Sequence, residues 1–108
     1  MAKPKTKRAP RTIRTQRFIE AHPDAPGALL YVAAVDAAIP LSVAAEAGGV
    51  SRYSAYLWAC GDVTPRPAQV TILRRLTNAL RTAIKAGELP THAMSSPEDL
   101  VALIRRYL

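Results

Sequence analysis

The sequence predicts an all-α domain, and three observations support this prediction. Apolar residues recur three and four positions apart through most of the chain, which is the spacing of one face of a helix. No stretch sustains the two-residue alternation that is typical of a half-buried strand. Proline, glycine and serine stand where the apolar segments begin and end. We therefore expect a compact fold of five helices, or of six if a short helix forms near Thr15.

Length and composition indicate one domain with a modest core. The chain has 108 residues, of which 49% are apolar, and a single cysteine, Cys60, so an intrachain disulfide is impossible. No apolar run approaches the roughly 18–20 residues of a membrane span, and the basic N-terminus lacks the apolar centre of a signal peptide. We expect a cytoplasmic, nucleoid-associated protein with no membrane partner.

The positive charge lies mainly at the N-terminus. The net charge is +7, and residues 1–20 hold seven Lys and Arg residues against Glu20 alone. Residues 1–11 are expected to form a disordered basic arm ahead of a domain over 12–108. Its cations are Lys3, Lys5, Lys7, Arg8 and Arg11. Such an arm is suited to the phosphates or the minor groove of double-stranded DNA. A solubilising tail is the alternative.

The first helices are predicted from apolar spacing and from proline. Residues 12–21 form a short helix, with Phe18 buried on the body so that it fixes the base of the arm. His22 to Gly27 form a loop with two prolines. A second helix is predicted over 26–38, with Pro26 in its first turn. Ile39-Pro40 ends it, because a residue before proline avoids the helical conformation.

Residues 41–61 are expected to form two short helices at a sharp turn. Ser42 caps the first helix, Gly48-Gly49 ends it, and Ser51 caps a second helix over 51–59. Spacing of three and four places an inward stripe on that second helix at Ala55, Trp58 and Ala59. The small residues Ala44, Ala45 and Ala55 allow the two helices to cross closely. The outward residues are then Arg52, Tyr53 and Tyr56.

Two longer segments complete the predicted fold. Residues 68–86 form the longest helix, with an apolar face that includes Leu73, Leu76 and Leu80, and Gly87 ends it. Its cations form a solvated face. The last helix covers 96–108 and begins with Ser96 as its cap. It either packs across the body or takes part in a homodimer contact.

The stretch from 41 to 67 resembles the helix-turn-helix of the Cro and phage-repressor (Xre-type) family. The resemblance is carried by a set of residues at the family's spacing: Ala45, Gly49, Val50, Ser51, Trp58, Gly61 and Pro65. It continues through the helix ending in Leu80 and covers roughly residues 26–80. Two residues depart from the family pattern. Ala55 stands where the family usually has Ile or Val, and Gly48 doubles the turn glycine.

The resemblance implies a lambda-repressor-like fold and a DNA-binding site. The second helix of the motif would enter the major groove with its N-terminal residues toward base edges. Carried onto this chain, the contact residues are Ser51, Arg52, Tyr53 and Tyr56, and Thr64 and Arg66 would approach phosphates from the following loop. Arg52 has the chemistry for a bidentate contact with guanine. Partial burial of the tyrosines beside Trp58, and a solvated Arg66, are the alternatives.

No set of residues predicts catalysis. His22 and His92 stand alone in loops, Cys60 has no charged partner at helical spacing, and no metal-ligand spacing occurs. We expect a protein that is no enzyme, with no cofactor, metal or small-molecule substrate. The predicted function is a sequence-specific DNA-binding regulator, a repressor of phage, prophage or plasmid type. The alternative is a protein-binding module on the same scaffold, such as an antitoxin or anti-activator.

Overall fold

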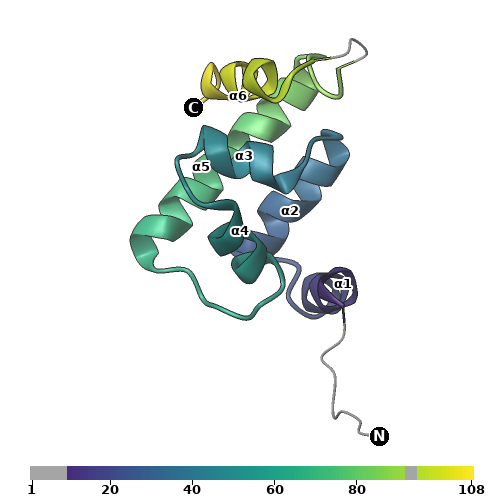
Figure 1. Cartoon of the computed structure of the whole chain (residues 1–108), viewed down its shortest axis with the longest axis vertical. Coiled ribbons are helices and arrows are strands. Elements are labelled where there is room, and N and C mark those ends of the chain that lie inside the picture. Colours follow the sequence, from purple (N-terminus) through teal and green to yellow (C-terminus); the bar gives the residue numbers. More distant parts are fainter. Residues whose placement is uncertain (1–9, 92–94) are drawn as a thin grey trace, which may run out of the picture.

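The computed structural model describes residues 10–91 and 95–108, and this part of the chain contains six α-helices and no strand (Figure 1). The helices are α1 (Arg11–Ala21), α2 (Pro26–Asp36), α3 (Leu41–Ala47), α4 (Arg52–Ala59), α5 (Pro67–Lys85) and α6 (Pro97–Arg105). The prediction of an all-α fold is confirmed. The optional short helix near Thr15 is present as α1 and brings the number of helices in the described residues to six.

The N-terminal boundary differs from the prediction. Lys3, Lys5, Lys7 and Arg8 lie outside the described residues. Arg11 does not belong to the arm, because it is the first residue of α1. The helix starts here because Pro10 precedes it in an extended conformation and accepts a hydrogen bond from the Arg14 backbone N–H at 3.0 Å. The basic segment ahead of the fold is therefore shorter than expected.

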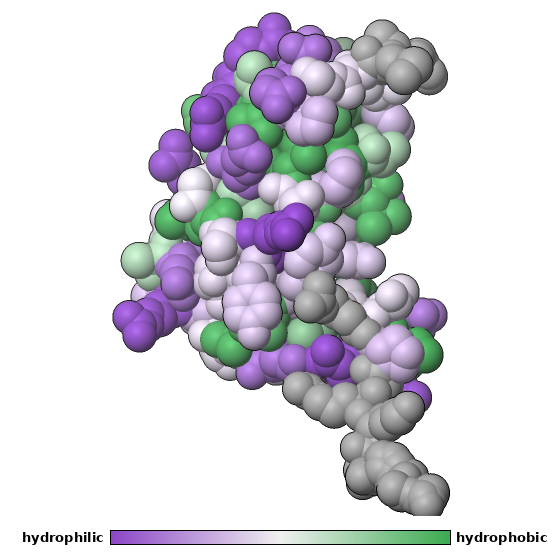
Figure 2. Space-filling model, in the orientation of Figure 1, coloured by the Kyte–Doolittle hydropathy of each residue, from purple (hydrophilic) through white to green (hydrophobic). Residues whose placement is uncertain are grey.

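The helices pack as a layered bundle around α2 and α5. These two helices lie side by side, α3 and α4 pack against α2, and α6 lies across α3 and α5 (Figure 1). Helix α1 lies against α2 and α4 at the other end from α6. On the face of the molecule that Figures 1 and 2 both show, hydrophilic residues are interspersed with hydrophobic ones, and the largest hydrophobic areas lie around α2 and α3.

Alanine and leucine supply most of the core. Small buried residues, among them Ala33, Ala44, Ala45 and Ala59, line the places where helices approach closely. The largest fully buried side chains are Leu30, Leu73, Leu76, Leu80, Leu89 and Ile104. The apolar face predicted for the longest helix is confirmed at Leu73, Leu76 and Leu80, whereas Leu29 and Val35 of α2 are exposed. Leu89 is an addition, because it lies in the loop after α5 and no helical spacing marks it.

Four helices are followed by a residue in the left-handed conformation. After α3, Val50 N–H donates to the Ala45 carbonyl at 3.0 Å, and Gly49 N–H donates to Glu46 at 3.0 Å, while Gly49 takes a φ of 74°. Gly61 and Gly87 hold the corresponding left-handed position after α4 and α5. Ala38 takes it after α2, with a φ of 57°. Glycine marks three of these ends in the sequence.

Several predicted bounds are corrected by these ends and by the caps. The second helix ends at Asp36 rather than residue 38, because Ala38 leaves the helical conformation. Ser42 does not cap α3: the helix begins at Leu41 after Pro40, so Ser42 lies in its first turn. The longest helix covers Pro67–Lys85, and the last one ends at Arg105 instead of 108.

The C-terminal helix packs across the body, which is one of the two predicted arrangements. Val101 and Ile104 are buried, and Ser96 caps the helix by accepting from Asp99 N–H at 3.1 Å. Arg105 donates to the carbonyls of Glu46 and Ala47, at 3.2 and 3.4 Å. These carbonyls form the negative end of α3, so the cation stabilises that end. A homodimer contact through this helix stays a prediction.

Replacement of Trp58 by alanine should destabilise the fold by about 3–5 kcal/mol. The side chain is 4% exposed and lies in the central core. Tyr53→Ala is the matched control, because Tyr53 lies on the same helix with 65% of its surface exposed. Thermal or denaturant unfolding of both variants measures the difference. Equal loss of stability in the two variants would contradict the observed rotation of α4.

Removal of the Tyr107 hydroxyl should destabilise the protein more at pH 7 than at pH 3. Tyr107 donates a hydrogen bond to the Glu88 carboxylate, and the Arg106 guanidinium donates to its other oxygen at 3.1 Å. The Tyr107 bond above all, and the Arg106 charge, lower the pKa of the Glu88 carboxyl. An acid with a lowered pKa in the fold contributes stability above its unfolded pKa and loses it as pH falls through the folded pKa. Melting temperatures of Tyr107→Phe across pH 3–7 test this.

The matched control is Tyr31→Phe, since the Tyr31 hydroxyl makes no hydrogen bond to a described residue. Its melting-temperature difference should stay constant with pH. A difference for Tyr107→Phe that does not shrink in acid would show that the Glu88 carboxylate is not held by this bond.

Candidate functional site

Helix α4 is held in one orientation by its cap, its inward stripe and a close backbone contact. Ser51 Oγ accepts from Ser54 N–H at 3.0 Å, which confirms the predicted cap. Ala55, Trp58 and Ala59 are buried, as expected. A Cβ placed on Gly27 of α2 would lie 2.5 Å from the Trp58 carbonyl oxygen. The outer face of α4 therefore turns away from α2.

The start of α4 presents an open hollow of about 370 Å³. It is lined by Ser42, Arg52, Tyr53 and Tyr56, so it includes three of the four predicted contact residues on this helix and its cap. Ser42 joins them from the first turn of α3, because the turn at Gly48–Val50 brings α3 next to the start of α4. The polar lining comprises one guanidinium and three hydroxyl groups.

The four predicted residues at the start of α4 differ in availability. Arg52 is exposed and makes no hydrogen bond or ion pair to a described residue. Tyr53 is also exposed, whereas Tyr56 is half-buried and packs against the core. The Ser51 hydroxyl caps the helix and donates to Ser54 Oγ at 3.0 Å. Arg52 and Tyr53 are thus the side chains freest to contact a ligand.

The predicted loop residues lie beyond the other end of α4. Thr64 and Arg66 are exposed, and neither lines the hollow around Arg52. Arg66 precedes α5, where its backbone N–H donates to the Gln69 side chain at 2.8 Å. Its guanidinium forms no ion pair with a described residue. Both loop residues are therefore available to an anionic ligand, at a separate place from Arg52.

The loop after α4 is fastened to α1, an arrangement that no spacing in the sequence predicts. Arg14 forms an ion pair with Asp62, and this bond raises the pKa of the Arg14 guanidinium. The same guanidinium lies 3.6 Å from the sulfur of Cys60, which is buried. Phe18 packs against Gly61, in the space that a Cβ would take. Cys60 thus has a cationic neighbour from another helix, which the spacing along the chain does not show.

Acidic side chains accompany the cations on the α3 side of the hollow. A neighbouring groove of about 450 Å³ extends from Arg52 along α3 to Pro97 and includes Glu46. The next hollow is lined by Glu46 and Glu98 together with Arg105 and Arg106. Two acids and two cations balance in this hollow, so α3 and α6 attract a polyanion less than a surface of cations alone would. A polyanion at Arg52 would therefore extend toward the loop after α4.

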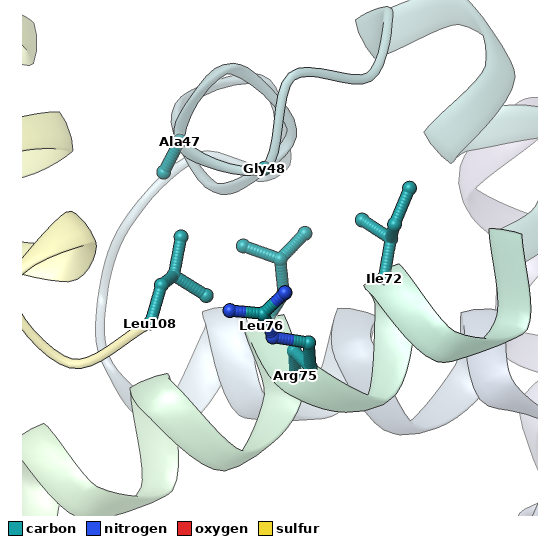
Figure 3. Close-up of a pocket in the computed structure, with 6 residues that line it drawn as sticks. All are labelled: Ala47, Gly48, Ile72, Arg75, Leu76 and Leu108. Atoms are coloured by element: carbon teal, nitrogen blue, oxygen red, sulfur yellow. The ribbon is translucent and has the colours of Figure 1, made fainter. Parts of the chain in front are cut away.

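A further pocket lies behind the turn and has a structural explanation. Its lining consists of Ala47, Gly48, Ile72, Arg75, Leu76 and Leu108, and its volume is about 100 Å³. Figure 3 shows the Leu76 side chain pointing toward Gly48. A Cβ on Gly48 would lie 2.5 Å from Leu76. The doubled glycine thus leaves space for leucine, and the pocket is smaller than typical ligand sites.

The described residues contain neither a group of metal-ligand side chains nor a single helix that could span a membrane. Within 10–91 and 95–108, no three His, Cys, Asp or Glu side chains are grouped so that they could hold a metal ion. Among the described helices none is alone long and apolar enough to cross a membrane, although α2 and α3, bent by 113° where they meet, pass the same test of length and composition as a pair.

Two features of this site escape reasoning from the sequence. Serine is a residue type that often caps a helix, and this is the role that the sequence suggests for Ser42. The packing of α3 against α4 instead places Ser42 beside the start of α4. Arg14 and Asp62 are 48 residues apart, and no pattern within either segment connects them. Packing of Phe18 on the body is predicted from the sequence, but without its partner Gly61.

Comparison with protein-family models, with curated proteins and with solved structures gave no match for this chain.

Proposed function

We propose that this protein binds double-stranded DNA in a sequence-specific manner and regulates transcription, as a repressor of phage, prophage or plasmid type. The observation that carries the proposal is the arrangement of α3 and α4. A left-handed Gly49 joins the two helices, and Arg52 and Tyr53 are exposed at the start of the second. The resemblance to the Cro and phage-repressor helix-turn-helix agrees with this arrangement.

Helix α4 has the dimensions and chemistry of a major-groove reader. It has eight residues, with its inner stripe fixed in the core and its outer residues concentrated near its first turn. Arg52 would read guanine O6 and N7 through its two terminal nitrogens. Tyr53 would contact a phosphate by its hydroxyl or a thymine methyl by its ring.

Electrostatics support one direction for the duplex. Arg66 lies on the loop side of α4, and the basic N-terminal residues precede α1, which is fastened to that loop. On the α3 and α6 side, Glu46 and Glu98 instead offset the cations Arg105 and Arg106. Phosphates would therefore pass near Thr64 and Arg66. Each phosphate neutralised by a cation releases counterions, which favours binding at low salt.

A protein partner is the second candidate function. It is favoured by Tyr53, which is 65% exposed beside Arg52, because tyrosine and arginine are enriched at protein interfaces. The mixture of Arg52 and Glu46 along one groove also suits a polar protein surface. An antitoxin or anti-activator would use this face without DNA. Selection from random duplexes at fixed salt separates the two candidates.

Arg52→Ala should cost about 1–3 kcal/mol on the selected duplex and much less on a scrambled one. The reason is that the variant cannot make the two hydrogen bonds to guanine, which a scrambled duplex does not offer in register. Kd is measured on both duplexes at several salt concentrations. Arg106→Ala, which removes the same charge from an exposed side chain just after α6, is the control and should leave the preference unchanged. Equal weakening on both duplexes would make Arg52 a phosphate contact.

Deletion of residues 2–9 should weaken binding to every duplex. The deletion removes Lys3, Lys5, Lys7 and Arg8 and leaves Pro10 to start α1. The slope of log K against log salt should become shallower by about 0.9 for each phosphate that is no longer neutralised. Base preference should not change. An unaltered slope would identify this segment as a solubilising tail.

A further inference from the structure

The two ends of α4 are held by different parts of the fold. Its C-terminal end lies against α2, where a Cβ on Gly27 would be 2.5 Å from the Trp58 carbonyl oxygen. Its N-terminal end carries Arg52 and follows the turn that closes α3. Arg52 is about 9 Å along the helix axis from the contact with α2. The position of Arg52 therefore also depends on what fixes this turn.

A side chain of α6 holds the end of α3. Arg105 Nε donates to the Ala47 carbonyl at 3.4 Å, and a terminal nitrogen of Arg105 donates to the Glu46 carbonyl at 3.2 Å. These are the last two carbonyls of α3, and the Glu46 carbonyl also accepts from Gly49 N–H at 3.0 Å within the turn. A cation is favourable at this negative end of a helix. Arg105 thus fixes the residues from which the chain continues to Ser51 and α4.

Helix α6 is itself fixed to the body, so it offers Arg105 from a firm base. Val101 and Ile104 are buried on its inner face. After the helix, Tyr107 donates to the Glu88 carboxylate, which follows α5. The guanidinium that holds α3 therefore comes from a helix that is anchored in the core and at the end of α5.

We propose that Arg105 is a positioning residue for base recognition: it holds the end of α3 and the turn after it, and thereby sets the place of Arg52 in the major groove. This inference rests on the proposed function and adds to it a residue on another helix that determines specificity without contacting DNA. A bidentate contact requires the Arg52 guanidinium in register with two atoms of guanine, whereas a phosphate contact carries no such requirement. Loosening the turn should therefore reduce the preference for the selected duplex and leave binding to a scrambled duplex intact.

The charge of Arg105 by itself predicts a different result. If Arg105 contacted a phosphate, its removal would weaken binding to both duplexes and make the salt slope shallower by about 0.9. The preference would then stay as in the wild type. The structure favours the positioning role, because the guanidinium already donates to α3, and Glu46 and Glu98 line the same hollow.

The experiment compares Arg105→Ala, Arg105→Lys and Arg106→Ala in the full chain. Arg106→Ala is the matched control, because it removes the same charge from the neighbouring residue, whose guanidinium forms an exposed pair with Glu88 at 3.1 Å. Kd is measured on the selected and the scrambled duplex across a salt series, at a temperature at which each variant is folded. Hydrogen exchange over residues 48–52 of the free protein reports whether the turn is loosened.

Arg105→Ala should reduce the ratio of the two affinities about two- to tenfold and speed exchange in the turn. Its Kd on the scrambled duplex and its salt slope should match those of Arg106→Ala. Partial unfolding would weaken both affinities alike, so a loss of stability alone does not alter the ratio. Arg105→Lys should keep most of the preference, because lysine can also donate to the last carbonyls of a helix.

A double-mutant cycle tests whether Arg105 acts through Arg52. In the Arg52→Ala background, Arg105→Ala should not reduce the ratio further, because the contact that Arg105 positions is already absent.

Three results would overturn the inference while leaving the proposed function in place. One is an affinity ratio of Arg105→Ala equal to that of Arg106→Ala. Another is unchanged exchange in the turn, since α3 would then keep its end without Arg105. The third is an equal reduction of the ratio with and without the Arg52 side chain, since Arg105 would then act independently of it. A wild-type chain that binds no duplex would overturn the proposed function and this inference together, even where Arg105→Ala speeds exchange in the turn.

Discussion

The backbone contact between α2 and α4 is the constraint on which the orientation of α4 depends. Gly27 lies so close to the Trp58 carbonyl that a Cβ would be 2.5 Å from its oxygen. Ala59, fully buried beside it, keeps the helices at this separation. With the two backbones in contact, Trp58 fills the adjacent core and Ala55 faces inward. Arg52 and Tyr53 are left on the outer surface as a consequence.

Glycines in the neighbouring turns act through the same steric limits. Gly49 supplies the left-handed conformation that ends α3, where a side chain on most residues would be strained. Gly48 has a φ of -88°, which residues with a side chain also adopt, so its role is to leave room for Leu76. Arg105 completes this region by donating to the last carbonyls of α3. The turn before α4 is thereby fixed from three sides: its own backbone, α5 and α6.

The surface around α4 is asymmetric, and this asymmetry favours a polyanion at one end. Glu46 and Glu98 lie toward α6, where they offset Arg105 and Arg106, while Arg66 lies in the loop on the other side. Asp62 is an acid on that second side, but it is engaged by Arg14. The pairing reduces the repulsion that a free carboxylate would exert there and connects α1 to the loop. A single ion pair thus affects both the charge and the geometry of the proposed interface.

The sequence by itself determined the helices, most of their caps and the inward stripe of α4, because these depend on residues within a few positions of each other. Ser51, Ser96 and the glycine ends are all marked locally. Only the tertiary structure placed Ser42 beside Arg52, moved the end of α2 to Asp36 through a left-handed Ala38, and buried Leu89. It also paired Arg14 with Asp62 across 48 residues. Such contacts depend on how helices pack, and spacing along one helix carries no information about its partner.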